Sequence, residues 1–152
     1  MVAEAVAAMP ALPPLRPALV AMTGLQALVA LALFAPGVLA PRMGIDPASL
    51  GLYTTAGFSV GMAASLGGGV LAGRLGAFRV ASLCALAVVA AMLCAMTGAG
   101  PAALLAAGVA IGLACGPETP ASSAILGRLA READRPVVFS VRQTGNQIGA
   151  MT

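Results

Sequence analysis

The feature that most constrains this chain is a series of apolar runs, each about twenty residues long, separated by short segments rich in glycine, proline and arginine. An α-helix rises about 1.5 Å per residue, so a run of about twenty residues matches the roughly 30 Å hydrocarbon core of a bilayer. The strands of a membrane barrel would instead alternate apolar with polar side chains, and the runs show no such alternation. We therefore predict an all-α, polytopic bundle of transmembrane helices.

The composition is typical of a chain that is solvated mainly by lipid. Hydrophobic residues make up 60% of the 152 residues and charged residues 9%, against roughly 25% charged in a soluble domain. Because the chain has no histidine and no glycine-rich phosphate loop, we expect no enzyme activity and no catalytic residue. The arginines lie between the apolar runs rather than in one patch, which argues against a nucleic-acid partner. Since the cysteines lie singly inside apolar runs, we expect inert thiols, no metal site and no cofactor at Cys84, Cys94 and Cys115.

The predicted organisation is a cytosolic tail at residues 1–16 and an incomplete N-terminal transmembrane bundle at residues 17–152. The expected helices cover residues 17–39, 50–72, 80–97 and 102–126, with a truncated fifth helix at residues 137–152. Pro117 and Pro120 are expected to interrupt the fourth helix, either by a plain kink, which we favour, or by a break of the kind found near transporter sites. Because the fifth run is short and has no charged flank, we expect the chain to be the N-terminal part of a longer protein or a prematurely ended reading frame.

The arginines fall unevenly on the two sides of the predicted bundle. Arg42 stands alone in the first connection, whereas the tail and the alternate connections hold Arg16, Arg74, Arg79, Arg128, Arg131 and Arg135. Arginine-rich connections tend to stay in the cytosol during insertion. We therefore expect a multi-pass protein of the cell inner membrane with its N-terminus in the cytosol.

Small residues recur every four positions in the second expected helix, at Gly57, Gly61, Ser65, Gly69 and Gly73. Residues four apart lie near one face of a helix, and a face without bulky side chains lets another helix approach closely. The fourth helix has a similar set at Gly108, Gly112 and Gly116. We interpret the stripe as a helix-packing surface. The alternative interpretation is a smooth face on which two helix bundles slide during a conformational change.

Residues 69–79, Gly-Val-Leu-Ala-Gly-Arg-Leu-Gly-Ala-Phe-Arg, resemble the signature loop between the second and third helices of the major facilitator superfamily. That loop reads Gly-x-x-x-Asp-Arg-x-Gly-x-basic-basic, and the chain matches it at Gly69, Arg74, Gly76 and Arg79. Gly73 stands where the family usually has aspartate, and Phe78 where a basic residue is common. Residues 116–123 and 139–145 are similar to the end of the fourth helix and the start of the fifth in some bacterial members.

The resemblance implies twelve helices in two six-helix halves, of which this chain supplies four complete helices and part of a fifth. It also implies transmembrane transport of a small solute by alternating access, with membrane lipid and the missing C-terminal half of the same protein as partners. In the family the signature loop is a conformational gate, and its aspartate makes charge contacts that hold the inward side closed. The alternative is a small four-helix membrane subunit with a structural or assembly role and no transport activity. A four-helix multidrug exporter would need a carboxylate in its first helix, and this chain has none there.

Glu118 is the only carboxylate inside an apolar run. A charge at the bilayer centre costs about 2.5–3.5 kcal/mol on insertion scales, so a partner is expected. Counted from the helix ends, Arg142 lies within about 6 Å of the same depth, and adjacent antiparallel helices would pair the two side chains. One hypothesis is a buried ion pair that locks two helices together. The other is a role in transport, in which Arg142 binds an anionic solute or Glu118 carries a coupling proton.

Polar amides inside the apolar runs are the remaining candidates for contacts with a solute, namely Gln26, Gln143 and Asn146, with Gln147 beside them. Amide groups in lipid are expected to turn inward, toward a cavity or a neighbouring helix. Packing between helices is the alternative role for each of these side chains. The sequence does not specify the solute or the direction of its movement.

Overall fold

The computed structural model describes residues 14–97 and 100–151, and every regular element in these ranges is helical. The elements are α2 (Leu15–Met43), α3 (Pro47–Leu75), α4 (Ala77–Met96), α5 (Pro101–Leu129), the short 3-10 helix η1 (Glu132–Asp134) and α6 (Arg135–Met151). By length and composition, the four helices α2 to α5 are each able to cross a membrane. The predicted all-α bundle of transmembrane helices is therefore confirmed. Most of the predicted tail, residues 1–13, lies outside the described residues, as does Thr152.

The helices α2, α3 and α5 extend beyond the predicted runs at both ends, and α4 and α6 begin before theirs. The helices α2, α3 and α5 each have 29 residues, which at about 1.5 Å per residue exceeds the roughly 30 Å hydrocarbon core. The helix α2 ends at Gly44, whose φ of 64° is left-handed. Asp46 caps α3, since its carboxylate accepts a hydrogen bond from the Ser49 amide at 2.9 Å. Hydrogen bonds from the Ser49 hydroxyl and amide hold the pKa of the Asp46 carboxyl below its ordinary value.

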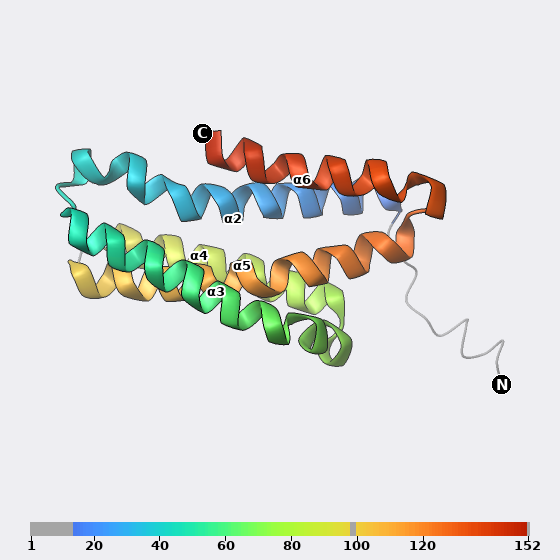
Figure 1. The fold of residues 1–152 in the computed structure, drawn as a ribbon, viewed down its shortest axis with the longest axis horizontal. Coiled ribbons are helices and arrows are strands. Elements are labelled where there is room, and N and C mark those ends of the chain that lie inside the picture. The colour runs from blue at the N-terminus through green and yellow to red at the C-terminus, as the bar shows by residue number, and fades with distance from the viewer. Residues whose placement is uncertain (1–13, 98–99, 152) are drawn as a thin grey trace.

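Two groups of helices make up the bundle (Figure 1). The red helix α6 lies along the blue helix α2, while α3, α4 and α5 lie together on the other side. The most extensive contacts are those of α3 with α5, followed by α4 with α5 and α2 with α6. The α3–α5 pair and the α2–α6 pair each run in the same direction. The start of α2 and the α3–α4 and α5–α6 connections share one end of the bundle, and the α2–α3 connection lies at the other.

Glycines let α5 approach the backbone of α3 directly. A Cβ atom placed at Gly112 would lie 2.7 Å from the Gly57 carbonyl oxygen, and one placed at Gly116 would lie 2.5 Å from the Gly61 carbonyl oxygen. Real Cβ atoms do not come so near to a backbone oxygen, so only glycine fits at these positions. Gly108 makes the same approach to the Tyr53 carbonyl.

The α2–α6 pair repeats this arrangement. A Cβ atom at Gly145 would overlap the Thr23 carbonyl oxygen of α2, and one at Gly149 would overlap the Ala27 carbonyl oxygen. The contact therefore advances by four residues on both helices, as it does between α3 and α5. Backbone-to-backbone packing through glycine thus joins both parallel pairs of the bundle.

The predicted stripe on α3 faces α5 in its first part and open space in its last part. Gly57 and Gly61 are buried against α5, but Gly69 and Gly73 face open space. Steps of four residues advance about 400° around a helix, so the stripe drifts by about 40° at each step and leaves the interface. The contact passes instead to Gly68 and Ala72, which are buried, whereas the Ser65 side chain is exposed.

Prolines lie inside two helices without ending them. The helix α2 continues past Pro36, which has no N–H to donate to the Ala32 carbonyl one turn earlier. The hydroxyl of Tyr53, a fully buried residue of α3, donates a hydrogen bond of 2.5 Å to that carbonyl. A break of the fourth helix at the prolines is not found, because α5 is one helix through Pro117 and Pro120. Both prolines pack on Gly68 of α3, where a Cβ atom would lie 2.7 Å from Pro120 Cγ.

Replacing Gly112 with alanine is expected to lower the free energy of unfolding by about 1–3 kcal/mol, because the new Cβ overlaps the α3 backbone. The matched change Gly69→Ala places its methyl group in open space and is expected to be neutral or to stabilise by up to about 1 kcal/mol. Unfolding of the purified chain in mixed micelles, followed by circular dichroism, measures both effects. Equal losses in the free energy of unfolding of the two variants would contradict a steric requirement for glycine where α5 contacts α3.

Candidate functional site

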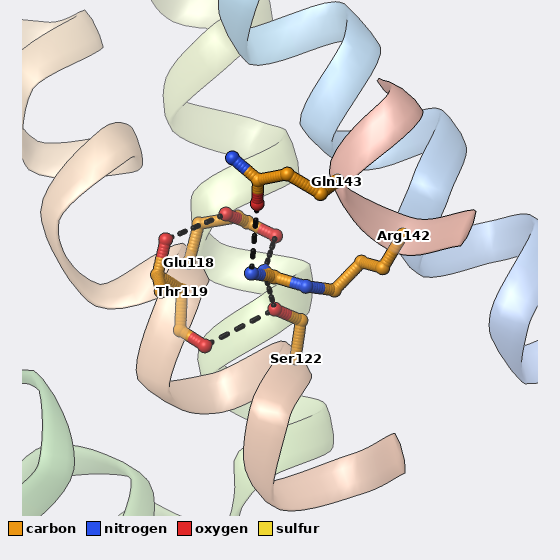
Figure 2. Close-up of polar contacts among 5 residues, drawn as sticks. All are labelled: Glu118, Thr119, Ser122, Arg142 and Gln143. Carbon is orange, nitrogen blue, oxygen red and sulfur yellow. Dashed lines mark hydrogen bonds and ion pairs between the residues drawn. The ribbon is translucent and has the colours of Figure 1, made fainter. Parts of the chain in front are cut away.

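Buried polar side chains of α5 and α6 meet inside the bundle. The described residues that are both buried and polar are Gln26, Ser49, Glu118, Ser122 and Arg142. Glu118 and Ser122 belong to α5, and Arg142 extends from α6 toward them (Figure 2). This cluster is the candidate site, because it brings together the two charged side chains that are buried among the described residues.

The contacts of the cluster form a short chain (Figure 2). Arg142 Nη1 donates a hydrogen bond of 2.7 Å to Ser122 Oγ and lies 3.7 Å from Glu118 Oε1. The Ser122 hydroxyl donates in turn to the Thr119 carbonyl oxygen at 3.2 Å. The Thr119 hydroxyl donates to Glu118 Oε2 at 3.3 Å. The guanidinium is therefore hydrogen-bonded to serine, while its contact with the carboxylate is electrostatic and longer.

The expected meeting of Glu118 and Arg142 is present, but the helix neighbours differ from the expectation. The helix α6 packs chiefly along α2 and touches α5 only slightly. Its buried residues, Val138, Arg142, Gly145 and Gly149, recur every three or four positions and so share one face. Gly145 and Gly149 hold this face against α2, and the long Arg142 side chain crosses to α5.

Several buried polar atoms retain hydrogen-bonding capacity. Within the described residues, no hydrogen bond engages Arg142 Nε, Glu118 Oε1, Gln26 Oε1 or Thr23 Oγ1. Buried polar atoms usually have partners, because each orphaned group costs about 1–3 kcal/mol. Arg142 Nε and Glu118 Oε1 belong to the ion pair itself. The pair therefore keeps one buried donor and one buried acceptor without a hydrogen-bond partner among the described residues.

The amides do not all turn inward as expected. Gln26 is buried and Asn146 is half-buried, but Gln143 and Gln147 are exposed. Gln143 Oε1 accepts a hydrogen bond of 3.5 Å from Arg142 Nη2, so this amide lies at the edge of the cluster. After its first residue, the exposed Arg135, the exposed polar residues of α6 are Ser140, Gln143, Thr144 and Gln147. At about 100° per residue they lie opposite the buried face, so a helix side that points away from the bundle is polar.

The residues that match the signature loop lie apart from the ion pair, at the end of the bundle where α3 turns into α4. Gly76 makes this turn with a φ of 88°, a conformation that favours glycine. Arg74, Arg79 and Gly69 are exposed. Their part in a conformational gate stays a proposal.

Sequence reasoning missed Ser122 and Thr119. Ser122 lies four residues after Glu118, an interval that places two side chains on one helix face. Thr119 directly follows Glu118. The spacing of Ser122 was the available signal, and it identifies the hydroxyl as a further ligand of the Arg142 guanidinium.

Replacing Arg142 with glutamine is expected to lower the free energy of unfolding by about 3–5 kcal/mol, because Glu118 is then a buried charge without a partner. Adding Glu118→Gln to that variant removes the charge and is expected to recover most of the loss. The control is Arg128→Gln, an exposed arginine at the end of α5, with an expected change below about 0.5 kcal/mol. Unfolding in mixed micelles measures all three variants. A loss in Arg142→Gln no larger than in the control would contradict a structural contribution of the pair.

The comparisons with known proteins identify one family. The family model of the Major Facilitator Superfamily matches residues 7–152, a range that holds the helices, the α3–α4 turn and the Glu118–Arg142 pair. A search of curated proteins and a search of solved structures each gave no match. Members of this family carry small solutes through membranes and are transporters rather than enzymes. The chain therefore belongs to the major facilitator superfamily, as a multi-pass membrane protein of that class of transporters.

Proposed function

We propose that the chain forms part of the N-terminal half of a secondary transporter that moves a small anionic solute by alternating access, with Arg142 as the solute-binding cation. The observation that carries this proposal is the buried ion pair between α5 and α6, in which Arg142 is 6% exposed and Glu118 is 3% exposed. Ionisable groups inside a membrane bundle are expensive, and they commonly mark a solute or ion pathway. The family membership supports the general activity.

The geometry of the pair suits exchange of one anion for another. The distance of 3.7 Å between Arg142 Nη1 and Glu118 Oε1 is too long for a strong charge-assisted hydrogen bond. A guanidinium presents a planar fork of donors, so it is able to hold Ser122 and a solute carboxylate or phosphate at once. In this proposal the solute replaces Glu118 as the counter-ion of Arg142.

Glu118 is proposed to carry the coupling proton. When Arg142 binds an anionic solute, two negative groups share one cation in a medium of low dielectric. A proton on Glu118 removes this repulsion, because the neutral carboxyl is able to keep the hydrogen bond from Thr119 without its charge. Solute and proton would then bind together and leave together.

The polar side of α6 supports the proposal that a C-terminal half of the same protein completes the transporter. Four exposed hydroxyl and amide residues lie on this side, opposite the face that packs on α2. The Thr144 hydroxyl donates to the Val141 carbonyl and Gln143 accepts from Arg142, but lipid offers no partner to the remaining donors and acceptors of such groups. A second helix bundle and the aqueous path between the bundles would supply those partners. The alternative, a structural four-helix subunit with a tail at residues 128–152, has less support, because α6 packs along α2 and shares the ion pair.

The proposed orientation places the N-terminus in the cytosol of a cell with an inner membrane. Arg16, Arg74 and Arg128 lie in segments at one end of the bundle, whereas Arg42 lies in the last turn of α2, at the other end. This asymmetry supports a cytosolic position for the arginine-rich end.

A cysteine-labelling experiment tests the orientation. In intact cells, the variant Arg42→Cys is expected to react with a membrane-impermeant maleimide, and Arg79→Cys is expected to react only after the membrane is permeabilised. Both positions are exposed, so accessibility from one side decides the outcome. The unsubstituted chain reports background from its native cysteines, of which Cys84 is buried. The reverse labelling pattern would contradict a cytosolic N-terminus.

Uptake into proteoliposomes tests the transport mechanism. The full reading frame that contains this chain is reconstituted, and accumulation of radiolabelled carboxylates and phosphate is measured with and without an inward proton gradient. We expect at least one of these anions to accumulate with the gradient. Arg142→Lys is expected to raise its KM by about tenfold, since an ammonium cannot form the bidentate contact. Glu118→Gln is expected to abolish accumulation while anion exchange persists.

The control for this assay is Glu132→Gln, a change at an exposed carboxylate of η1 that is expected to leave uptake unchanged. Gradient-driven accumulation that survives Glu118→Gln would remove Glu118 from the mechanism. Uptake that is unaffected by Arg142→Lys would contradict the solute-binding role of Arg142.

A further inference from the structure

A shallow groove lies where α3 gives way to α4. It is lined by Leu75, Phe78, Arg79, Ser82 and Leu83. The three apolar side chains of this lining are 42%, 43% and 51% exposed, in that order along the chain. The groove therefore combines an exposed apolar surface with the guanidinium of Arg79.

The arginines at this groove have no carboxylate near them in the chain. Between Asp46 and Glu118 the sequence contains no acidic residue, while Arg74 and Arg79 both lie in that interval. Both are exposed, and within residues 14–97 and 100–151 no ion pair or hydrogen bond engages either of them. By contrast, Arg142 pairs with Glu118, and Arg135 donates a hydrogen bond to the Gly127 carbonyl. Arg79, which lines the groove, and Arg74, which directly precedes Leu75 of its lining, thus have no counter-ion from the described part of the chain.

The position of the groove suits a lipid. The helix α3 ends at Leu75 and α4 begins at Ala77, so the groove starts at the end of the bundle and runs along the first turns of an apolar helix. At this level a bilayer changes from hydrocarbon to headgroups. A ligand that is apolar along its length and negative at one end matches both parts of the surface.

We propose that this groove binds an anionic phospholipid, whose acyl chain lies along Leu75, Phe78 and Leu83 while its phosphate contacts Arg79 and Arg74. Charge complementarity selects this occupant, because a zwitterionic lipid brings a cation to the same two arginines. The helices α3 and α4 both pack on α5, and the α3–α4 turn joins them. Bound lipid would therefore stabilise the position of this turn. The site is independent of the transported solute.

Native mass spectrometry of the purified chain tests the site. The chain in detergent micelles is titrated with phosphatidylglycerol, and with phosphatidylcholine of the same acyl chains. We expect phosphatidylglycerol to bind more tightly, and Arg74→Gln with Arg79→Gln to weaken its binding by roughly fivefold per arginine. Phosphatidylcholine binding is expected to change little in this variant. Arg74→Lys with Arg79→Lys is expected to keep the preference, which separates loss of charge from loss of structure.

Matched variants distinguish lipid binding at this groove from a general effect of the positive charge of the protein. Arg42→Gln changes an exposed arginine at the other end of the bundle, and Arg128→Gln with Arg131→Gln changes two at the same end. Both are expected to keep the lipid preference, and a loss equal to that of the Arg74 and Arg79 variant would overturn the local site. Leu83→Ser is expected to weaken phosphatidylglycerol binding, because it removes part of the apolar surface that the acyl chain contacts. Competition by glycerol 3-phosphate as strong as that by the lipid would overturn a lipid site in favour of a free phosphate site.

Discussion

The bundle depends on the direct approach of parallel helix backbones through glycine. Lipid is as apolar as leucine, so burial of apolar surface does not drive helices together, and close packing must supply the stability. Gly112 and Gly116 bring α5 against the α3 backbone. Glu118 lies two residues after Gly116, about 200° around the helix, so the same helix turns its glycines to α3 and its carboxylate toward α6. The placement of the intramembrane charge is therefore a consequence of the glycine contact.

The prolines show the same dependence on neighbouring helices. A bilayer core has no water to satisfy a carbonyl that loses its helical donor, so another side chain must do so. Pro36 deprives Ala32 of that donor, and Tyr53 supplies a hydroxyl from α3. Pro117 and Pro120 lie where Gly68 leaves room for their rings. Proline in α2 and α5 is thus tolerated because α3 provides a donor at one point and space at another.

The sequence predicts positions along the membrane normal well and lateral positions poorly. Run lengths locate the helices, and residue counting places Glu118 and Arg142 at one depth, because both follow from the rise per residue. The packing of α6 on α2 does not follow from depth. The drift of the glycine stripe away from Gly69 requires knowledge of where α5 crosses α3. Ser122 escapes notice because hydroxyls in helices commonly bond a carbonyl of their own helix, as Ser65 and Ser82 do here.

The two sides of α6 constrain what this helix is for. Its buried side holds Gly145 and Gly149 against α2 and extends Arg142 to Ser122, so that side packs against the bundle. Its opposite side is polar but uncharged, and Gln143 on that side accepts a hydrogen bond from the same Arg142. Lipid gives a polar stripe no stabilisation, and a purely structural helix gains nothing from one. A helix that connects a buried cation to an outward polar surface is instead suited to pass a hydrated solute between that surface and the cation, which is why we propose a transport role for the ion pair beside its role in packing.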